Sequence, residues 1–184
     1  MLLYNSIGPN PRVVRMFMAE RGIELPRQEV DLLAGENRRE PYLDKNAAGQ
    51  CPALQLDDGM VLAEITAICE YLDEITPGAS LIGKTPEQRA EARMWARRID
   101  LNILEPMANG FRYSDGIKMF RARIHCIPAA AADLKQIARD WLGKLDRMMD
   151  GKTYICGDRL TLADILLFCF LDFFNGMGQP INQE

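Results

Sequence analysis

One stretch of the chain combines a carboxylate with backbone groups that attract anions. Residues 53–56 alternate apolar and polar side chains as a half-buried strand does, and Asp57-Asp58-Gly59 turns the chain into a short return strand at residues 60–62. Apolar residues then recur with the spacing of one helix face, at Ile65, Ile68, Cys69 and Leu72. Glu64 stands at the start of that helix, where free N–H groups favour negative charge. The stretch therefore predicts a site for a ligand with both an amine and an acid at one end.

A proline fixes where this site begins. Pro52 has no N–H to donate to a strand ladder, so it must stand at the mouth of the strand that follows it. The Cys51–Pro52 peptide is thereby expected beside the helix start that carries Glu64.

These segments resemble the glutathione-binding half of the cytosolic glutathione transferases. Gly49-Gln50-Cys51-Pro52-Ala53-Leu54 and the later Leu62-Ala63-Glu64-Ile65-Thr66-Ala67-Ile68 are similar to the family patterns G-K/Q-V-P-A-L and L-x-E-S-x-A-I. A third segment, Gly157-Asp158-Arg159-Leu160-Thr161-Leu162-Ala163-Asp164-Ile165, is similar to the signature of the family's helical domain. The resemblance implies an α/β thioredoxin-like glutathione-binding domain at residues 1–76, a linker at 77–84 and an all-α helical-bundle domain at 85–184. It also implies a homodimer.

The resemblance assigns glutathione contacts to particular residues. Glu64 would receive the γ-glutamyl ammonium, and the helix start at Ile65 and Thr66 would receive its carboxylate, although the family usually has serine where Ile65 stands. Arg38 and Gln50 match positions that hold the glycyl carboxylate. Two simpler interpretations stay open: Glu64 as a first-turn acid that complements the helix dipole, and Arg38 as part of a solvated turn.

The resemblance also gives Cys51 and Pro52 a role. Cys51 would act through its backbone N–H and C=O, a role that we favour over thiol chemistry, and Pro52 would follow a cis peptide bond. Only about 5% of X–Pro bonds in folded proteins are cis, so composition alone does not predict this one.

The loop before the first helix decides what happens to the glutathione sulfur. A thiol titrates near ~8.5, and a helix N-terminus with a hydrogen-bond donor lowers that pKa. Family members place Tyr, Ser or Cys here, whereas this chain has Gly8 and Asn10 at the serine and cysteine positions. The loop with Asn10 resembles that of the nu-class bacterial enzymes. We therefore expect the Asn10 amide to donate a hydrogen bond to the glutathione sulfur, with Ser6 as the alternative donor. Asn10 could equally be no more than the N-cap of the helix.

The second substrate leaves a weaker trace. Met107, Phe111 and Tyr113 lie on a long helix where they could overhang the cleft, and we take them as candidates for a second-substrate pocket. An apolar stripe at this spacing is also typical of a helical core or a dimer contact.

Composition narrows the other possibilities. The net charge of −4 gives no basic footprint, which argues against nucleic acid as a partner. Five cysteines form no C-x-x-C pair and no metal-type spacing, so we expect neither a metal nor a cofactor other than glutathione as co-substrate. The apolar start is soon interrupted by polar residues, and the run at 165–174 is too short to span a bilayer. We therefore expect a cytoplasmic protein without a membrane segment.

Local signals predict the remaining elements. Asn10-Pro11 should open a helix that ends at Gly22, and a helix from Pro86 should kink or end at Pro106 or Gly110. Other expected elements are strands at residues 2–4 and within 25–33, and helices at 41–46, between 128 and 149, and after the capping box at 161–164. Family members usually continue with another helix or two beyond the segment at 171–174, and we expect those helices to be missing from this chain.

Three functions fit this sequence to different degrees. The leading interpretation is an enzyme that activates the glutathione thiol, either for conjugation to an electrophile or for reduction of a disulfide or peroxide. The missing Tyr, Ser or Cys favours the reductive chemistry without excluding conjugation. The alternative is a non-catalytic interaction module, as the same fold provides in translation and transcription factors. A glutaredoxin is disfavoured, because the loop at residues 6–10 has no cysteine.

Overall fold

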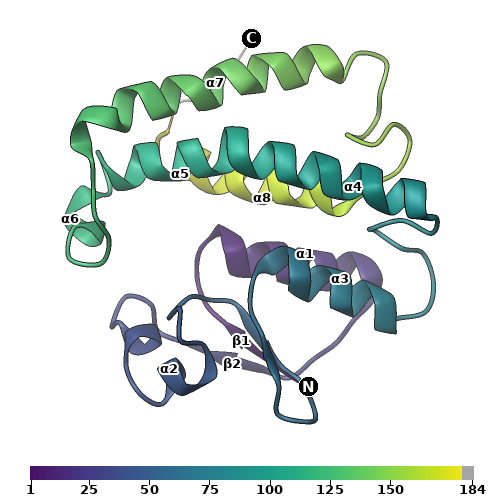
Figure 1. The fold of residues 1–184 in the computed structure, drawn as a ribbon, viewed down its shortest axis with the longest axis horizontal. Coiled ribbons are helices and arrows are strands. Elements are labelled where there is room, and N and C mark those ends of the chain that lie inside the picture. The colour runs from purple at the N-terminus through teal and green to yellow at the C-terminus, as the bar shows by residue number, and fades with distance from the viewer. Residues whose placement is uncertain (180–184) are drawn as a thin grey trace. The chain divides into compact units, whose positions relative to one another are not determined.

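The computed structural model describes residues 1–179 and divides the chain into two compact units, Met1–Pro86 and Glu87–Glu184. In the first unit the elements are β1 (Leu2–Asn5), α1 (Pro9–Arg21), β2 (Arg27–Glu29), the 3-10 helix η1 (Glu36–Arg38), α2 (Tyr42–Lys45), β3 (Ala53–Gln55), β4 (Val61–Leu62) and α3 (Ile65–Ile75) (Figure 1). The strand order is β2-β1-β3-β4, with β1 and β2 parallel and the other pairs antiparallel. This is the predicted thioredoxin-like arrangement.

The core of the first unit lies between the sheet and two helices. Leu3 pairs with Leu54, which pairs in turn with Leu62, and neither Leu3 nor Leu54 has any exposed surface. α1 and α3 pack against each other on one side of the sheet (Figure 1). Their fully buried side chains are Val13, Val14, Phe17, Ile68, Cys69 and Leu72. The predicted inward face of α3 is therefore confirmed at Ile68, Cys69 and Leu72.

The start of α1 differs from the prediction. The helix begins at Pro9, one residue before Asn10, and Gly8 is its N-cap with a φ of 101° that favours glycine. Proline fits the first helical position because its missing N–H would have no partner there. Asn10 is thus the second residue of the helix, and the interpretation of Asn10 as the N-cap was wrong. The predicted end is confirmed, because Gly22 closes the helix in the left-handed conformation.

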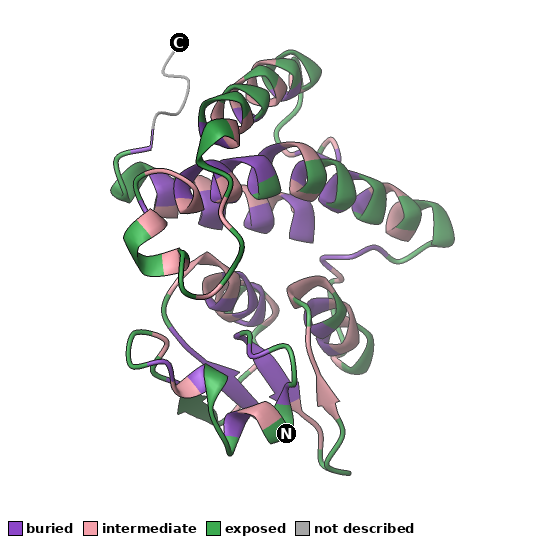
Figure 2. Ribbon diagram, turned by 60° about the vertical axis from the view of Figure 1, so that its left-hand side comes forward, coloured by how far each residue is buried: buried purple, intermediate pink, exposed green. Residues whose placement is uncertain are grey.

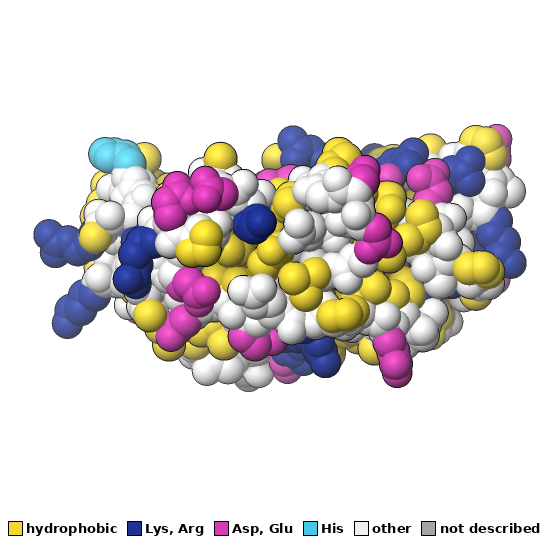
Figure 3. Space-filling view, turned by 90° about the horizontal axis from the view of Figure 1, so that it is seen from below, with side chains coloured by type: hydrophobic (Ala, Val, Ile, Leu, Met, Phe, Trp, Pro, Cys, Tyr) yellow, Lys and Arg dark blue, Asp and Glu magenta, His cyan; other side chains and the backbone are white. Residues whose placement is uncertain are grey.

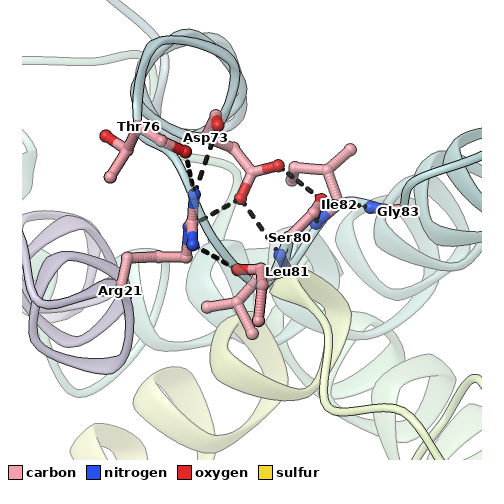
Figure 4. A network of polar contacts seen from close by, with 8 residues as sticks. Arg21, Asp73, Thr76, Ser80, Leu81, Ile82 and Gly83 are labelled. Carbon is pink, nitrogen blue, oxygen red and sulfur yellow. Dashed lines mark hydrogen bonds and ion pairs between the residues drawn. The ribbon is translucent and has the colours of Figure 1, made fainter.

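A buried ion pair holds the segment that follows α3. Arg21, the last residue of α1, pairs with Asp73 on α3 and donates to the backbone carbonyls of Thr76 and Ala79 (Figure 4). The carboxylate of Asp73 also accepts from the hydroxyl of Ser80. One arginine therefore ties two helix ends and the following loop together.

The second unit consists of helices. They are α4 (Pro86–Ile99), the π-helical turn η2 (Asp100–Leu104), α5 (Glu105–Arg112), α6 (Ile117–Phe120), the 3-10 helix η3 (Pro128–Ala130), α7 (Ala131–Met148) and α8 (Leu162–Gly176). The all-helical class predicted for this half is confirmed. The capping box before α8 is also present, with Thr161 and Asp164 each bonding the other's backbone.

The long helix passes Pro106 through a widened turn. Pro106 cannot donate to the carbonyl four residues earlier, and the π-helical turn η2 stands directly before it. The side-chain amide of Asn102 donates to the carbonyl of Arg98 over 2.8 Å. Of the two predicted outcomes, a kink or an end, the helix does not end: it continues through the π-helical turn and past Pro106 to Arg112.

Burial follows this architecture in each unit. Figure 2 shows buried residues on the central strands of the sheet and along the middle helices of the second unit. α8 contributes most to the second core, with buried side chains at Leu162, Ala163, Ile165, Leu166, Cys169, Phe170 and Phe174. On the face in Figure 3, acidic, basic and hydrophobic side chains are interspersed. Among residues 1–179, no helix is both long and apolar enough to cross a membrane.

Candidate glutathione site

The Cys51–Pro52 peptide is cis and leads directly into β3. The Cys51 side chain is buried in a cluster with Tyr4, Val30, Tyr42 and Ala53. Its thiol donates to the Tyr42 hydroxyl over 3.2 Å, and burial raises the pKa of the Cys51 thiol above its ordinary value. The thiol therefore belongs to the core, which leaves the backbone of Cys51 as the part that can meet a ligand.

The β3–β4 hairpin joins this peptide to Glu64. Leu54 pairs with Leu62 and Gln55 with Val61, so the chain enters β3 from Pro52 and leaves β4 towards Glu64 at the same end of the hairpin. Glu64 is exposed and precedes the first residue of α3. The strand pairing supports the predicted proximity of the Glu64 carboxylate to Pro52, which stays a prediction.

Glu64 has an unusual backbone conformation. Its φ is 68°, and it is the one non-glycine residue with a positive φ in the part of the chain that the structure describes. Such conformations cost ~1–3 kcal/mol and occur preferentially at functional sites. No side chain caps the start of α3, so the first N–H groups, at Ile65 and Thr66, can receive an anion.

Gln50 and Arg38 lie on the segment before the proline. Gln50 is exposed, and its backbone carbonyl accepts hydrogen bonds from Tyr42 and Asn46. Arg38 ends η1, and its guanidinium lies over Gly35, where an added Cβ would approach its Nη2 to 2.8 Å. Both side chains are accessible to an anionic ligand on this unit.

The Ser6 hydroxyl already donates a hydrogen bond within the protein. Ser6 is buried, and its hydroxyl donates to the carbonyl of Val30 over 2.5 Å. A hydroxyl has one proton to donate, so this bond competes with any donation to a sulfur. Arg15 holds the same loop by donating to the Ser6 carbonyl over 3.0 Å and to the Asn5 side chain over 2.6 Å.

Asn10 is placed differently. It is half-buried in the first turn of α1, and no side chain caps that helix start. Because its side chain does not cap the helix, its amide N–H groups can donate hydrogen bonds to a ligand. The partial positive charge of the helix start further favours a negatively charged ligand atom there. Of the two predicted sulfur donors, the geometry therefore favours Asn10 over Ser6.

Comparison with known proteins identifies the family. The chain matches the Glutathione S-transferase N-terminal domain over residues 7–75 and the Glutathione S-transferase C-terminal domain over residues 128–184. It is 30% identical over 176 residues to Glutathione S-transferase 2 of Saccharomyces cerevisiae, covering 94% of this chain and 76% of that protein. This chain belongs to the glutathione S-transferase family.

Solved structures of the family resemble this chain over its full length. A glutathione S-transferase domain-containing protein of Marinobacter aquaeolei VT8 has a TM-score of 0.91 at 29% identity, covering 100% of this chain and 91% of that chain. Gtt2 of Saccharomyces cerevisiae has a TM-score of 0.88 at 27% identity, covering 100% of this chain and 89% of that chain.

The chain is also similar in sequence to a translation factor. Elongation factor 1-gamma of Homo sapiens is 33% identical over 135 residues, which are 73% of this chain and 29% of that protein.

The predicted second-substrate residues lie mostly in the core of the second unit. Met107 and Phe111 are buried, and Phe111 makes edge-to-face contacts with Phe120 and Phe174 at centroid distances of 6.3 and 5.8 Å. Tyr113 is half-buried at the end of α5. The second-substrate pocket thus stays a prediction. Within residues 1–179, no group of His, Cys, Asp and Glu could hold a metal ion.

Sequence reasoning missed Tyr42 and Asn46. They are four residues apart on and directly after α2, so they share one helix face. Both reach the carbonyl before Cys51. Their spacing within the predicted helix at residues 41–46 was the available signal, but what that helix face contacts is set by tertiary structure.

Proposed function

We propose that this protein is a cytoplasmic, homodimeric glutathione-dependent enzyme that activates the glutathione thiol. The observation that carries the proposal is the β3–β4 hairpin, which joins the cis Cys51–Pro52 peptide at its entry to Glu64 at the uncapped start of α3. These groups offer a carboxylate, helix-start N–H groups and the backbone N–H and C=O of Cys51 within one short segment.

Each end of glutathione has a matching group. The γ-glutamyl ammonium binds the Glu64 carboxylate, and its carboxylate binds the N–H groups of Ile65 and Thr66, with the Thr66 hydroxyl as a further donor. The loss of the family serine at Ile65 removes one hydroxyl but keeps the backbone N–H. Arg38 and Gln50 bind the glycyl carboxylate.

The middle of glutathione lies along the backbone of Cys51. Its N–H and C=O pair with the cysteinyl residue of the ligand, as one strand edge pairs with another. The buried thiol of Cys51 takes no part in the reaction.

Asn10 then acts on the sulfur. Its amide donates to the glutathione sulfur, and the start of α1 stabilises the thiolate over the thiol. With an electrophilic carbon, the thiolate forms a C–S bond while the leaving group departs with its electron pair. With a disulfide, the thiolate forms a new S–S bond and the displaced sulfur leaves as a thiolate. The Asn10 loop, which resembles that of the nu class, favours the disulfide reaction.

Asn10→Ala tests this mechanism against both an aryl halide and a mixed disulfide of glutathione. Loss of a charge-assisted hydrogen bond worth about 1.5–3 kcal/mol should lower kcat/KM by ~10–100-fold. Asn175→Ala, an exposed asparagine near the end of α8, is the matched control and should keep wild-type rates. Unchanged rates of Asn10→Ala with both substrates would remove Asn10 from the mechanism.

A non-catalytic interaction module is the second candidate function. It is favoured by the similarity to elongation factor 1-gamma and by Ile65 in the place of the family serine. Retention on immobilised glutathione, followed by elution with free glutathione, separates the two candidates. A protein that does not bind at millimolar glutathione would be an interaction module, not an enzyme of this chemistry.

A further inference from the structure

Three buried side chains hold the backbone directly before Cys51. The hydroxyl of Tyr42 donates to the Gln50 carbonyl over 2.6 Å, and the side-chain amide of Asn46 donates to the same oxygen over 2.9 Å. One residue earlier, the amide of Asn37 donates to the carbonyl of Gly49. All three donors belong to residues less than 9% exposed: Tyr42 at 4%, Asn37 at 8% and Asn46 at 8%.

The two donors on Gln50 fix more than one atom. Its carbonyl oxygen has two lone pairs, and Tyr42 and Asn46 together occupy them. The Gln50 carbonyl and the Cys51 N–H belong to one planar trans peptide, in which they point in opposite directions. Holding the carbonyl therefore aims the N–H of Cys51.

Tyr42 is itself held in place. The Cys51 thiol donates to the Tyr42 oxygen over 3.2 Å, so the hydrogen bonds run from thiol to hydroxyl to carbonyl, a sequence in which each bond strengthens the next. The Tyr42 ring meets the Tyr4 ring edge to face at a centroid distance of 5.8 Å. Burial raises the pKa of Tyr42, which keeps its hydroxyl protonated and able to donate.

We propose that Tyr42 and Asn46 are positioning residues for glutathione, which orient the Gln50–Cys51 peptide so that the Cys51 N–H meets the cysteinyl backbone of the ligand. This inference rests on the proposed glutathione-binding function. The two side chains touch the protein and not the ligand, so they act on binding through the peptide that they hold.

Tyr42→Phe tests the proposal against Tyr4→Phe. Both variants delete one hydroxyl from the same buried cluster, but the Tyr4 hydroxyl donates to the Gln55 side chain and not to the Gln50 carbonyl. We expect Tyr42→Phe to raise the Kd for glutathione, measured by calorimetry, about fivefold or more, because one of the two bonds on the carbonyl is lost. Tyr4→Phe should bind within about twofold of wild type, and kcat at saturating glutathione should change little in either variant.

A merely structural role for Tyr42 gives a different result. If both variants show similarly lowered thermal midpoints and both keep the wild-type Kd for glutathione, Tyr42 has a structural role only. That result would overturn the proposal. A wild-type protein that does not bind glutathione overturns the proposed function and this inference together. Wild-type binding with an unchanged Tyr42→Phe overturns this inference alone.

Asn46→Asp covers the case in which Tyr42→Phe does not fold. The Asn46 side-chain oxygen accepts from the Ala48 N–H over 3.1 Å, and aspartate keeps that turn while losing the donor to Gln50. A Kd raised about fivefold or more supports the proposal, and a wild-type Kd contradicts it.

Discussion

Arg21 and Asp73 form an ion pair 2.9 Å long between Nε and Oδ1, and their side chains are only 4% and 8% exposed. The arginine also donates to the carbonyls of Asp73, Thr76 and Ala79, while the carboxylate accepts from the N–H of Leu81 (Figure 4). The pair is thus the point at which both helices and the following segment of the first unit meet. A buried pair with this many hydrogen bonds is costly to break from one side.

Removing the arginine should therefore destabilise the protein strongly. We predict that Arg21→Ala lowers the free energy of unfolding by about 3–5 kcal/mol, because Asp73 would stay buried without its cation. Arg27→Ala, an exposed arginine on β2, is the control and should change stability by less than ~0.5 kcal/mol in urea unfolding. If the two variants unfold at the same urea concentration, the ion pair does not contribute as described.

The glycine at position 116 allows close packing of an aromatic ring. A Cβ added to Gly116 would lie 2.7 Å from the Phe111 ring, which is enclosed by Phe120 and Phe174. We predict that Gly116→Ala costs about 1–3 kcal/mol by overpacking. Gly176→Ala, with nothing within 4 Å of the added Cβ at the end of α8, should be neutral or slightly stabilising. Equal stability of the two variants in thermal unfolding would show that the ring can move away.

Asp115 should contribute to the acid dependence of stability. Its carboxylate accepts from Lys135 over 2.6 Å and from Gln179 over 3.1 Å, and these contacts, led by that of Lys135, lower the pKa of Asp115 from 3.8 to about 2. A folded-state pKa below the unfolded value stabilises the protein above that value, and the contribution is lost as pH falls through the folded-state pKa. The stability difference between wild type and Asp115→Asn should therefore shrink as the pH falls from about 4 to about 2. Asp150→Asn removes the same charge from an exposed position, and an identical pH profile for both variants would refute the assignment.

The thiol of Cys51 should be dispensable for the reaction. Because the thiol is buried and its pKa is raised, we predict slow alkylation of Cys51 in the native protein compared with the half-buried Cys126. Cys51→Val should keep kcat/KM within about threefold of wild type. The substitution nearly conserves the volume of the core and removes only a thiol that does not meet the ligand. A loss of tenfold or more would return the thiol to the mechanism.

Local signals predicted much of the fold because they are read from neighbouring residues. The αL glycine at position 22, the capping box at Thr161 and the inward face of α3 all arise within a few residues of chain. The helix start at Pro9 was missed because two prolines flank Asn10, and either could occupy the first turn. The π-helical turn before Pro106 was missed, because helix propensity does not indicate how a proline is accommodated within a helix.

The parts of the candidate site that were predicted correctly are those indicated by the family pattern or by the hairpin. The cis bond at Pro52 came from resemblance and is confirmed, and the hairpin places Glu64 and that peptide at the same end of two paired strands. The hydrogen bonds of Ser6 and Tyr42 were out of reach, because their partners depend on how segments distant in sequence pack. Assignment of the Asn10 loop to the nu class stays a prediction.

Binding of glutathione beside Glu64 is the central claim, and calorimetric titration of wild type and Glu64→Gln tests it most directly. Glutamine keeps the shape of the side chain but loses the charge that receives the γ-glutamyl ammonium, so we predict a Kd raised by ~10–100-fold. Glu24→Gln, an exposed acid between α1 and β2, should bind like wild type. Wild type that binds at millimolar glutathione, together with a weakened Glu64→Gln, would support the account. Equal affinities of wild type and Glu64→Gln, or no binding by wild type, would contradict it.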